Sequence, residues 1–414
     1  MMDAAEEANR KERALKACDR FFHPSHNLSV HGITGTNGKT TSTYLIENLL
    51  RAAGERPAII GTVSNRFEDY SLPVINTTPG PEELQQTMRD FLDRGATSIV
   101  IEVTSHALQQ FRAWGTRFKS VSFTNLTQDH LDYHKTIEQY YQAKRRLFFD
   151  YETSFRIINN DDPWGRALAS ECLQASLQTS LYTYPSDVSL SARGIQTKIN
   201  DIEIISPMLG AFNVHNISLA VTLGQCLGIQ PHIISKAMKE CLPVPGRMER
   251  VTGPNPKSEP IVIVDYAHTP DALEKALLTV KPLCRGRLTL VFGCGGNRDS
   301  IKRPLMGAIA AKLADHIIIT SDNPRAENPE DIVNQIMTGL NAELTAGTGT
   351  TFFVCLDRRK AIQKAILPCT IADIVLIAGK GHENYQIIGD SQGCTQKIHF
   401  DDREEAKIAL SLRN

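Results

Sequence analysis

The sequence predicts an α/β protein: a central domain of the P-loop type with a mainly parallel sheet, followed by a C-terminal Rossmann-like α/β domain. Short runs rich in Val and Ile recur along the chain, separated by helix-patterned segments, which is typical of parallel strands buried on both faces. The 414 residues also exceed what one hydrophobic core normally organises. Two prolines and a glycine at 243–247 interrupt the pattern and predict a boundary near residue 245.

The elements follow in order. Residues 1–28 begin with a charged, alanine-rich stretch, 3–22, which predicts one helix and is too short to form a domain. Strands of the central domain, 29–245, are predicted at 28–30, 58–61, 98–103, 120–124 and 156–159. Strands of the C-terminal domain, 246–414, are predicted at 261–265, 288–293, 316–320, 352–354 and 374–378. Their spacing suits strand–helix–strand crossovers.

Composition excludes several classes of protein. The net charge of -1 argues against nonspecific nucleic-acid binding and electrostatic docking on a membrane. No apolar run approaches the roughly 20 residues that span a bilayer, and the N-terminus lacks the apolar core of a signal peptide. The nine cysteines form no Cys-x-x-Cys pair and suit a reducing compartment. We therefore expect a cytoplasmic protein.

The strongest motif is the glycine-rich stretch at 32–41, between an extended segment and a helix pattern. Its glycines allow backbone N–H groups to point inward at a phosphate, and the helix N-terminus adds partial positive charge. Lys39 can reach terminal phosphates, and the Thr40 hydroxyl can bind Mg²⁺. A tight turn without a ligand is the alternative. Ile33 occupies the position where strict P-loop spacing has a glycine, so the loop is a variant.

Two polar clusters follow strands of the central domain, where open α/β sheets bind ligands. Glu102, in Glu-Val-Thr-Ser-His, could bind Mg²⁺ or simply cap the next helix. The segment 124–134 packs His130, His134, Asp129 and Asp132 closely together, which suits metal binding or proton transfer. A solvated loop at the start of a helix is the alternative.

The C-terminal domain repeats this arrangement. Asp265 could hold ribose hydroxyls or cap a helix. Arg298, in a glycine-rich run after a strand, could pair with a carboxylate. Asp322-Asn323-Pro324-Arg325 offers an acceptor, an amide and a cation to a zwitterion, and Glu383 could meet an ammonium group. An ordinary turn and a flexible surface loop are the alternatives for these last two segments.

Together these motifs resemble the Mur ligase family of cell-wall synthesis, and most closely its MurE branch. The loop Gly-x-x-Gly-Thr-x-Gly-Lys-Thr is that family's form. Further matches follow in the family's order and reach the C-terminus: Asn-Thr-Thr-Pro-Gly-Pro at 76–81, Glu-Val-Thr-Ser-His-Ala-Leu at 102–108, Asp-His-Leu-Asp-Tyr-His at 129–134, Gly-Arg-Met-Glu at 246–249, Asp-Tyr-Ala-His-Thr-Pro at 265–270, Asp-Asn-Pro-Arg at 322–325 and Gly-Lys-Gly-His-Glu at 379–383.

The resemblance implies an ATP-dependent amide ligase that adds meso-diaminopimelate to UDP-MurNAc-L-Ala-D-Glu through an acyl phosphate. It implies Mg²⁺ as cofactor, small-molecule substrates only, a monomer, and no nucleic-acid or membrane partner. Asp-Asn-Pro-Arg resembles the form that selects diaminopimelate, since Arg325 can pair with the distal carboxylate that lysine lacks. A folylpolyglutamate synthase-like ligase and a truncated, catalytically silent nucleotide-binding module are the competing interpretations.

The resemblance also implies roles for individual residues. The catalytic set comprises Lys39, Glu102, His130 and Lys144. The metal ligands comprise Thr40, Glu102, His130 and Lys144, with Lys144 as a carbamate; from the sequence alone, Lys144 is a surface lysine on an amphipathic helix. ATP would contact Gly35, Thr36, Asn37, Gly38, Lys39, Thr40, Thr41, Asn213, Asn216, Arg247, Asp265 and His268. The muramyl dipeptide would contact Asn76, Thr77, Thr78, Thr104, Gln110 and Arg112. Diaminopimelate would contact Arg298, Asp322, Asn323, Pro324, Arg325, Gly379 and Glu383.

The chain departs from the family's pattern before the loop. Members have a uridine-gripping first domain, whereas residues 1–28 match only a linking helix, the remnant of such a domain. Position 104, usually Ser, is Thr, and Phe212 stands where related ligases have His. We expect weak affinity for the UDP-linked substrate and intact ATP binding, because remote binding energy supports such substrates. Calorimetry with both ligands tests this, and ordinary affinity for the UDP-linked substrate would contradict it.

Overall fold

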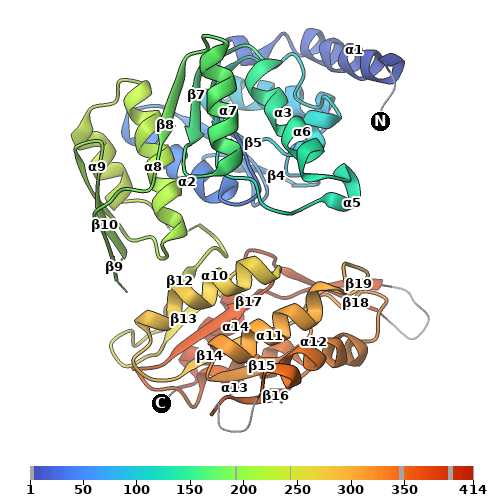
Figure 1. Cartoon of the computed structure of the whole chain (residues 1–414), viewed down its shortest axis with the longest axis vertical. Coiled ribbons are helices and arrows are strands. Elements are labelled where there is room, and N and C mark those ends of the chain that lie inside the picture. The colour runs from blue at the N-terminus through green and yellow to red at the C-terminus, as the bar shows by residue number, and fades with distance from the viewer. Residues whose placement is uncertain (1–3, 192–193, 243, 345–348, 390–394, 414) are drawn as a thin grey trace. The chain divides into compact units, whose positions relative to one another are not determined.

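The computed structural model describes residues 4–191, 194–242, 244–344, 349–389 and 395–413. The chain divides into two compact units, Met1–Leu242 and Pro243–Asn414. Pro243, which begins the predicted break, lies outside the described residues. Both units are α/β with largely parallel sheets, which confirms the predicted fold class (Figure 1).

The main sheet of the first unit runs in the order β4-β3-β2-β5-β1-β6-β7-β8. From β2 to β8 neighbouring strands are parallel, and β3 and β4 add an antiparallel edge. The strands are β1 (Ser29–Thr34), β2 (Pro57–Ile60), β3 (Asn65–Phe67), β4 (Tyr70–Leu72), β5 (Ser98–Glu102), β6 (Phe118–Phe123), β7 (Thr153–Asn159) and β8 (Thr179–Tyr182). The predicted strands of this region are confirmed, with ends shifted by up to four residues.

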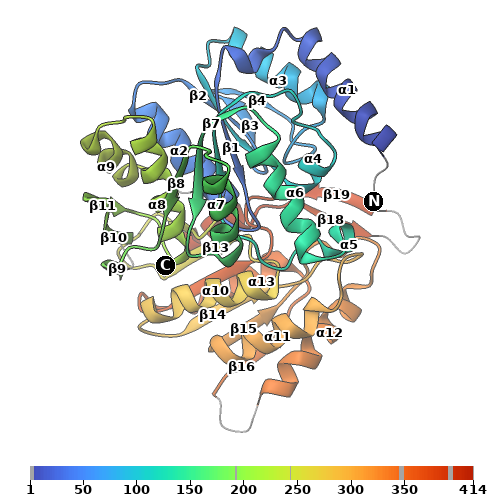
Figure 2. The same ribbon diagram turned by 45° about the horizontal axis from the view of Figure 1, so that its top comes forward.

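Helices cover both faces of this sheet because β1 and β5 carry apolar side chains on each side. One face packs on α3, α4, α6 and α7 in a single core, and α2 and α8 contact the sheet from the other side (Figure 2). The helices are α1 (Ala4–Arg20), η1 (Pro24–His26), α2 (Lys39–Ala52), α3 (Pro81–Asp93), α4 (Ser105–Gln109), α5 (Leu131–His134), α6 (Ile137–Phe149), α7 (Pro163–Gln174), α8 (Phe212–Cys226) and α9 (Pro231–Lys239).

A small antiparallel sheet in this unit was not predicted. It runs β11-β10-β9, from β9 (Val188–Ser191), β10 (Gly194–Ile199) and β11 (Ile202–Ser206). Buried Ile195, Thr197 and Ile199 alternate with exposed Gln196 and Lys198, which is the period of a half-buried hairpin strand. A search for continuous apolar runs overlooks this pattern.

The sheet of the second unit runs β12-β13-β17-β14-β15-β16, parallel except for β12. One face packs on α13 and α14, while α10, α11 and α12 pack in series (Figure 1). The elements are β12 (Glu249–Val251), β13 (Ile261–Asp265), α10 (Pro270–Val280), η2 (Lys281–Leu283), β14 (Leu288–Phe292), α11 (Lys302–Leu313), β15 (His316–Ile319), α12 (Pro329–Glu343), β16 (Thr351–Val354), α13 (Arg358–Ile366), β17 (Ile374–Ala378), β18 (Tyr385–Gly389), β19 (Thr395–His399) and α14 (Asp402–Ser411).

Strand order determines which loops come together. In the first unit, β5, β1 and β6 are adjacent, so the segments after Glu102, Thr34 and Phe123 meet at one edge. In the second unit the same holds for the segments after β13, β17, β14 and β15. These are the loops that carry the predicted motifs, as expected for an open α/β sheet.

Candidate functional site

The phosphate loop joins β1 to α2, as predicted. Gly35 has φ 148°, and a Cβ there would lie 1.8 Å from Thr124 Oγ1, so the close approach of β6 requires glycine. Gly38 has φ 87° and caps α2, and its Cβ would lie 2.4 Å from Asn216 Oδ1. Lys39 Nζ donates to the carbonyl oxygens of Gly35 at 2.8 Å and Thr36 at 2.9 Å. The Lys39 side chain therefore folds back onto the phosphate loop.

Glu102 lies beside this loop at the end of β5 and is only 1% exposed. Its Oε2 accepts from Thr40 Oγ1 at 3.0 Å, and the N–H of Thr62 donates to its Oε1 at 2.9 Å. Gly61 makes room for it, because a Cβ there would lie 2.5 Å from Oε1. A buried carboxylate next to the loop hydroxyl supplies the hard oxygen donors that Mg²⁺ prefers.

Lys144 is fully enclosed, contrary to its reading from the sequence alone as a surface lysine. Its side chain comes from α6, is 1% exposed, and donates from Nζ to the carbonyl oxygen of Gly35 at 2.9 Å. The same carbonyl accepts from Lys39, so two ammonium groups share one acceptor. Burial, and secondarily the charge of Lys39, hold the pKa of Lys144 well below its ordinary value. The arrangement favours a neutral amine.

His130 and Lys144 both lie near the aromatic ring of Tyr140. Lys144 Nζ is 4.5 Å from the centroid of the Tyr140 ring, and the His130 ring centroid is 6.1 Å from it. Tyr140 also hydrogen-bonds Thr36 of the loop, with 3.2 Å between their oxygens. His130 has φ 54°, a left-handed conformation that is uncommon outside glycine and often marks a functional position. The two predicted ligands thus belong to one neighbourhood.

The residues predicted for the muramyl dipeptide are connected by hydrogen bonds. Thr78 Oγ1 donates to the backbone oxygen of Glu102 at 2.8 Å and lies 3.2 Å from Thr104 Oγ1. Arg112 donates to the Thr78 carbonyl at 3.0 Å and, from Nε and Nη2, to Gln110 Oε1. The Thr78 hydroxyl reaches the backbone of Glu102 directly, which connects the residues predicted for the acceptor substrate with the predicted metal ligand.

Two further pairs of predicted residues lie close to Glu102 and to the helix after the phosphate loop. Thr77 Oγ1 is 3.1 Å from Thr62 Oγ1, which itself contacts Glu102, and Asn76 is exposed beside it. Asn216 Oδ1 accepts from Ser42 Oγ at 3.2 Å, and its Nδ2 donates to Asn213 Oδ1 at 2.8 Å. Both asparagines are buried residues of α8, and through Ser42 they stabilise α2, the helix that follows the phosphate loop.

In the second unit, Asp265 lies partly buried at the end of β13. Its oxygens accept from the N–H groups of Met248 at 2.7 Å and Ala267 at 2.8 Å. Burial raises its pKa, although the nearby Arg247 opposes the shift. Arg247 stacks over the Tyr266 ring at 4.6 Å, and His268 Nδ1 is 2.9 Å from the Tyr266 carbonyl oxygen. Asp265, Arg247 and His268 therefore form one cluster.

A second cluster of this unit joins the loops after β15 and β17. Asn323 Nδ2 donates to Glu383 Oε2 at 2.9 Å. Asp322 Oδ1 is buried and has no hydrogen-bond partner among the residues that the structure describes. Gly379, with φ 119°, faces the other oxygen of Asp322, and Pro324 is buried beside Asn323. Asp322 Oδ1 has an ion pair with Lys380 Nζ at 3.5 Å but no hydrogen bond with a described residue, so it can accept one from a ligand such as an ammonium group.

The two predicted arginines flank one glycine. A Cβ at Gly295 would lie 3.0 Å from Arg325 Nη1 and 3.7 Å from Arg298 Cγ. Arg325 Nη1 donates to the carbonyl oxygen of Gly296 at 2.9 Å, and its backbone N–H donates to Ile387 at 3.1 Å. The backbone of Arg325 is left-handed, with φ 53°. Cations and acidic groups from four adjacent strands therefore share this edge of the sheet.

Sequence reasoning missed three contributors. Tyr140 contacts Thr36 and Lys144, Thr62 holds Glu102, and Lys380 lies fully buried between Asp322 and Glu383. Lys380 stands inside a motif that was recognised, but a lysine between two glycines gives no sign of burial. The other two lie outside the motifs.

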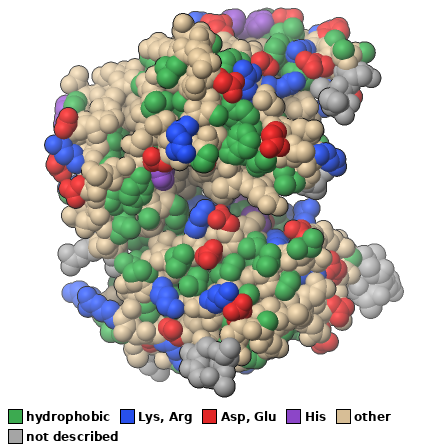
Figure 3. All heavy atoms as spheres, viewed as in Figure 1, with side chains coloured by type: hydrophobic (Ala, Val, Ile, Leu, Met, Phe, Trp, Pro, Cys, Tyr) green, Lys and Arg blue, Asp and Glu red, His purple; other side chains and the backbone are tan. Residues whose placement is uncertain are grey.

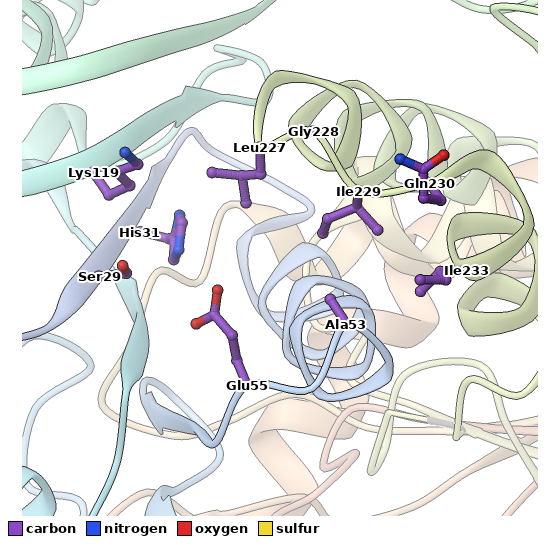
Figure 4. Close-up of a pocket in the computed structure, with 10 residues that line it drawn as sticks. All are labelled: Ser29, His31, Ala53, Glu55, Lys119, Leu227, Gly228, Ile229, Gln230 and Ile233. Atoms are coloured by element: carbon purple, nitrogen blue, oxygen red, sulfur yellow. The ribbon is translucent and has the colours of Figure 1, made fainter.

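A separate cavity of about 390 Å³ opens at the opposite end of the first unit's sheet, where β1 and β6 begin (Figure 4). Ser29, His31, Glu55 and Lys119 supply its polar wall, and Leu227 and Ile229 supply apolar surface. Burial lowers the pKa of His31 to about 3, so the ring is neutral at physiological pH. None of the predicted site residues lines this cavity.

The surface shows no preference for one charge on the face drawn in Figure 3, where acidic and basic side chains are interspersed. Among the described residues, no helix is both long and apolar enough to span a membrane.

Comparison with known proteins identifies the family. Residues 33–224 match the Mur ligase middle domain, and residues 246–381 match the Mur ligase glutamate ligase domain. A UDP-N-acetylmuramoyl-L-alanyl-D-glutamate--2,6-diaminopimelate ligase of Thermosynechococcus vestitus is 44% identical over 96% of this chain and 81% of its own length. The protein of the same name from Gloeobacter violaceus is 46% identical over 95% and 79%.

Solved structures agree. A ligase of that name superposes with a TM-score of 0.66 at 34% identity, covering 93% of this chain and 78% of its own. A folylpolyglutamate synthase of Mycobacterium tuberculosis reaches 0.69 at only 16% identity, covering 90% and 93%, so that likeness shows the fold alone. With relatives this similar over nearly its whole length, the chain belongs to the MurE branch of the Mur ligase family.

Proposed function

We propose that this protein joins meso-diaminopimelate to UDP-N-acetylmuramoyl-L-alanyl-D-glutamate at the expense of ATP, in peptidoglycan synthesis. The observation that carries the proposal is that one chain contains both a phosphate loop, in which Thr40 hydrogen-bonds Glu102, and a cluster of charged groups suited to a zwitterion. That cluster comprises Asp322, Arg325 and Glu383. The relatives of the same branch, 44–46% identical, support the choice of substrates. We place the reaction in the cytoplasm and expect a monomer.

The chemistry follows from the substrates. A carboxylate is a poor electrophile, so its oxygen first attacks the γ-phosphorus of ATP and ADP leaves. The amine then attacks the acyl carbon, phosphate leaves, and the nitrogen loses a proton. Two anions approach each other in the first step, so cations must offset their repulsion. Lys39 and the N–H groups of the loop would stabilise the transferred phosphoryl group.

We propose that Mg²⁺ binds at Thr40 and Glu102, with His130 and carbamylated Lys144 at a second position. The fit rests on the buried Glu102 carboxylate beside the Thr40 hydroxyl, and on the shared Tyr140 neighbourhood of His130 and Lys144. Bound there, Mg²⁺ would neutralise phosphate charge as the phosphoryl group moves. The hydroxyls of Thr78 and Thr104 and the Arg112 guanidinium would position the acceptor carboxylate.

The test is a phosphate-release assay with every substrate omitted in turn. We expect release to require ATP, the UDP-linked dipeptide and diaminopimelate together, and to yield one new amide. ATP binding without phosphate release, even with all three substrates present, would identify a catalytically silent nucleotide-binding module. Extension of a folate substrate with glutamate would support the folylpolyglutamate synthase-like alternative.

Glu102→Gln keeps the size of the side chain and removes its charge. We expect the Mg²⁺ concentration for half-maximal activity to rise by at least about tenfold, the scale on which metal sites respond to lost supporting groups. A Mg²⁺ titration of phosphate release measures it.

Glu47→Gln is the matched control for this substitution. Glu47 is also a buried carboxylate of the first unit, but it pairs with Arg51 and Arg66 instead of the loop. The Glu47→Gln substitution should lower the free energy of unfolding and leave the Mg²⁺ requirement unchanged. Equal Mg²⁺ curves for Glu102→Gln and the unmodified protein would contradict the assignment.

A further inference from the structure

The strongest unassigned feature of the second unit is the Lys380 side chain, which is 0% exposed. Its Nζ lies 3.2 Å from Asn323 Oδ1, 3.3 Å from Glu383 Oε2 and 3.5 Å from Asp322 Oδ1. An ammonium group has three N–H donors, and three acceptors surround this one. The contacts with Asn323 and Glu383 are hydrogen bonds and the contact with Asp322 is an ion pair, so the charge of Lys380 acts on these three protein groups.

Those neighbours are the groups proposed to meet the incoming amino acid. Lys380 offsets one of the two negative charges of Asp322 and Glu383, which would otherwise repel each other in a buried setting. One net negative charge then remains for the ammonium group of the ligand. Without the lysine, the carboxylates would separate or retain a proton, and either change weakens binding of a cation.

Lys380 also determines the orientation of an amide. Asn323 Oδ1 accepts from Lys380 Nζ and from the N–H of Ile387 at 2.9 Å, while Nδ2 donates to Glu383 at 2.9 Å. Two donors on one side and a carboxylate on the other allow only one placement of oxygen and nitrogen. The cluster is thus preorganised before a ligand arrives, which favours affinity.

We propose that Lys380 is a positioning residue that holds Asp322, Asn323 and Glu383 in the arrangement that binds the ammonium group of the amino-acid substrate. This rests on the proposed function, since it assigns diaminopimelate to that cluster. The role differs from direct recognition, because the buried Nζ hydrogen-bonds Asn323 and Glu383 and pairs with Asp322. It predicts an effect on amino-acid affinity that is larger than any effect on ATP.

The experiment compares Lys380→Met and Lys380→Arg with the unmodified protein. We expect Lys380→Met to raise KM for diaminopimelate by about tenfold or more, with KM for ATP changed less than about twofold. Lys380→Arg keeps the charge and should recover part of the loss. Circular dichroism and the melting temperature establish that each variant is folded.

A core variant separates positioning from general stability. Ile366→Ala, in α13 and 0% exposed, should lower the melting temperature without moving KM for diaminopimelate relative to ATP. An unchanged KM for diaminopimelate in folded Lys380→Met, or parallel losses for both substrates, would overturn the role of Lys380. An unmodified protein that does not ligate diaminopimelate would instead overturn the proposed function.

If Lys380→Met does not fold, binding can be measured through its neighbour. Asn323→Asp removes the amide that Lys380 orients and places a third carboxylate beside the lysine. The same selective rise in KM for diaminopimelate is expected, with ATP unaffected. A folded Asn323→Asp protein with ordinary KM values would overturn the proposal as well.

Discussion

Lys144→Ala is expected to lower kcat by about 10²- to 10³-fold, the scale on which loss of one preorganised charged group acts in catalysis. The expectation rests on a carbamate at Lys144, in which the neutral amine attacks carbon dioxide, a C–N bond forms and a proton leaves. Burial and the charge of Lys39 lower the pKa of this amine, so the neutral form that reacts is accessible. The product is a carboxylate-like group where the unmodified side chain is a cation.

Three measurements examine this. Isotope-labelled carbon dioxide should give a carbamate signal in the carbon NMR spectrum that disappears in Lys144→Ala. Short carboxylates such as formate or acetate should restore part of the activity, because the truncated side chain leaves room for them. The loss should appear in kcat more than in KM for ATP, since Lys39 and the loop are intact.

The sign of the pH dependence follows from the lowered pKa. As pH falls through the pKa of the folded protein, Lys144 takes up a proton and can no longer carry the carbamate. Activity should therefore decline on acidification, and more steeply in buffers depleted of carbon dioxide. Lys119→Ala, at an exposed lysine of β6, is the control and should show neither effect. Full activity of Lys144→Ala without added carboxylate would contradict the carbamate.

The parallel strands could be predicted because each is an apolar run buried on both faces, as β5 and β17 show. The loops at their carboxyl ends followed from topology, and the motifs in those loops indicated phosphate and zwitterion chemistry. The antiparallel strands β10 and β11 were not predicted, because alternating apolar and polar residues give a weaker signal than a continuous apolar run.

Side-chain environments were harder to predict than strands. Lys144 lies on the face of α6 that carries the buried Tyr140 and Leu147, but a lysine is normally exposed, and its contact with the Gly35 carbonyl is formed only in the folded chain. The same holds for Lys380, whose two glycine neighbours suggest an exposed loop. Burial of a lysine depends on which acceptors other segments bring to it, and one segment's sequence does not contain that information. The resemblance to a family indicated a role for Lys144, whereas no sequence feature indicated a role for Lys380.

Arg325→Ala is expected to lower kcat/KM for diaminopimelate by roughly 30-fold or more, since truncating one partner of a hydrogen-bonded charge pair costs about 2–5 kcal/mol. Among the described residues, Nη1 carries the side-chain hydrogen bonds of Arg325, so Nε and Nη2 keep donors for a carboxylate. The strand pairing with Ile387 and Ile388 fixes the backbone in its left-handed conformation and so directs this side chain.

The substrate itself supplies the decisive control for Arg325. L-Lysine lacks the distal carboxylate, so Arg325→Ala should reduce the preference for diaminopimelate over lysine while leaving the poor lysine reaction nearly unchanged. The pair of substrates and the pair of proteins form a cycle that isolates the guanidinium–carboxylate contact. KM for ATP should be unaffected, because the phosphate loop belongs to the first unit. Equal losses for diaminopimelate and lysine, or a parallel loss for ATP, would show that Arg325 supports the structure of the loop and does not select the substrate.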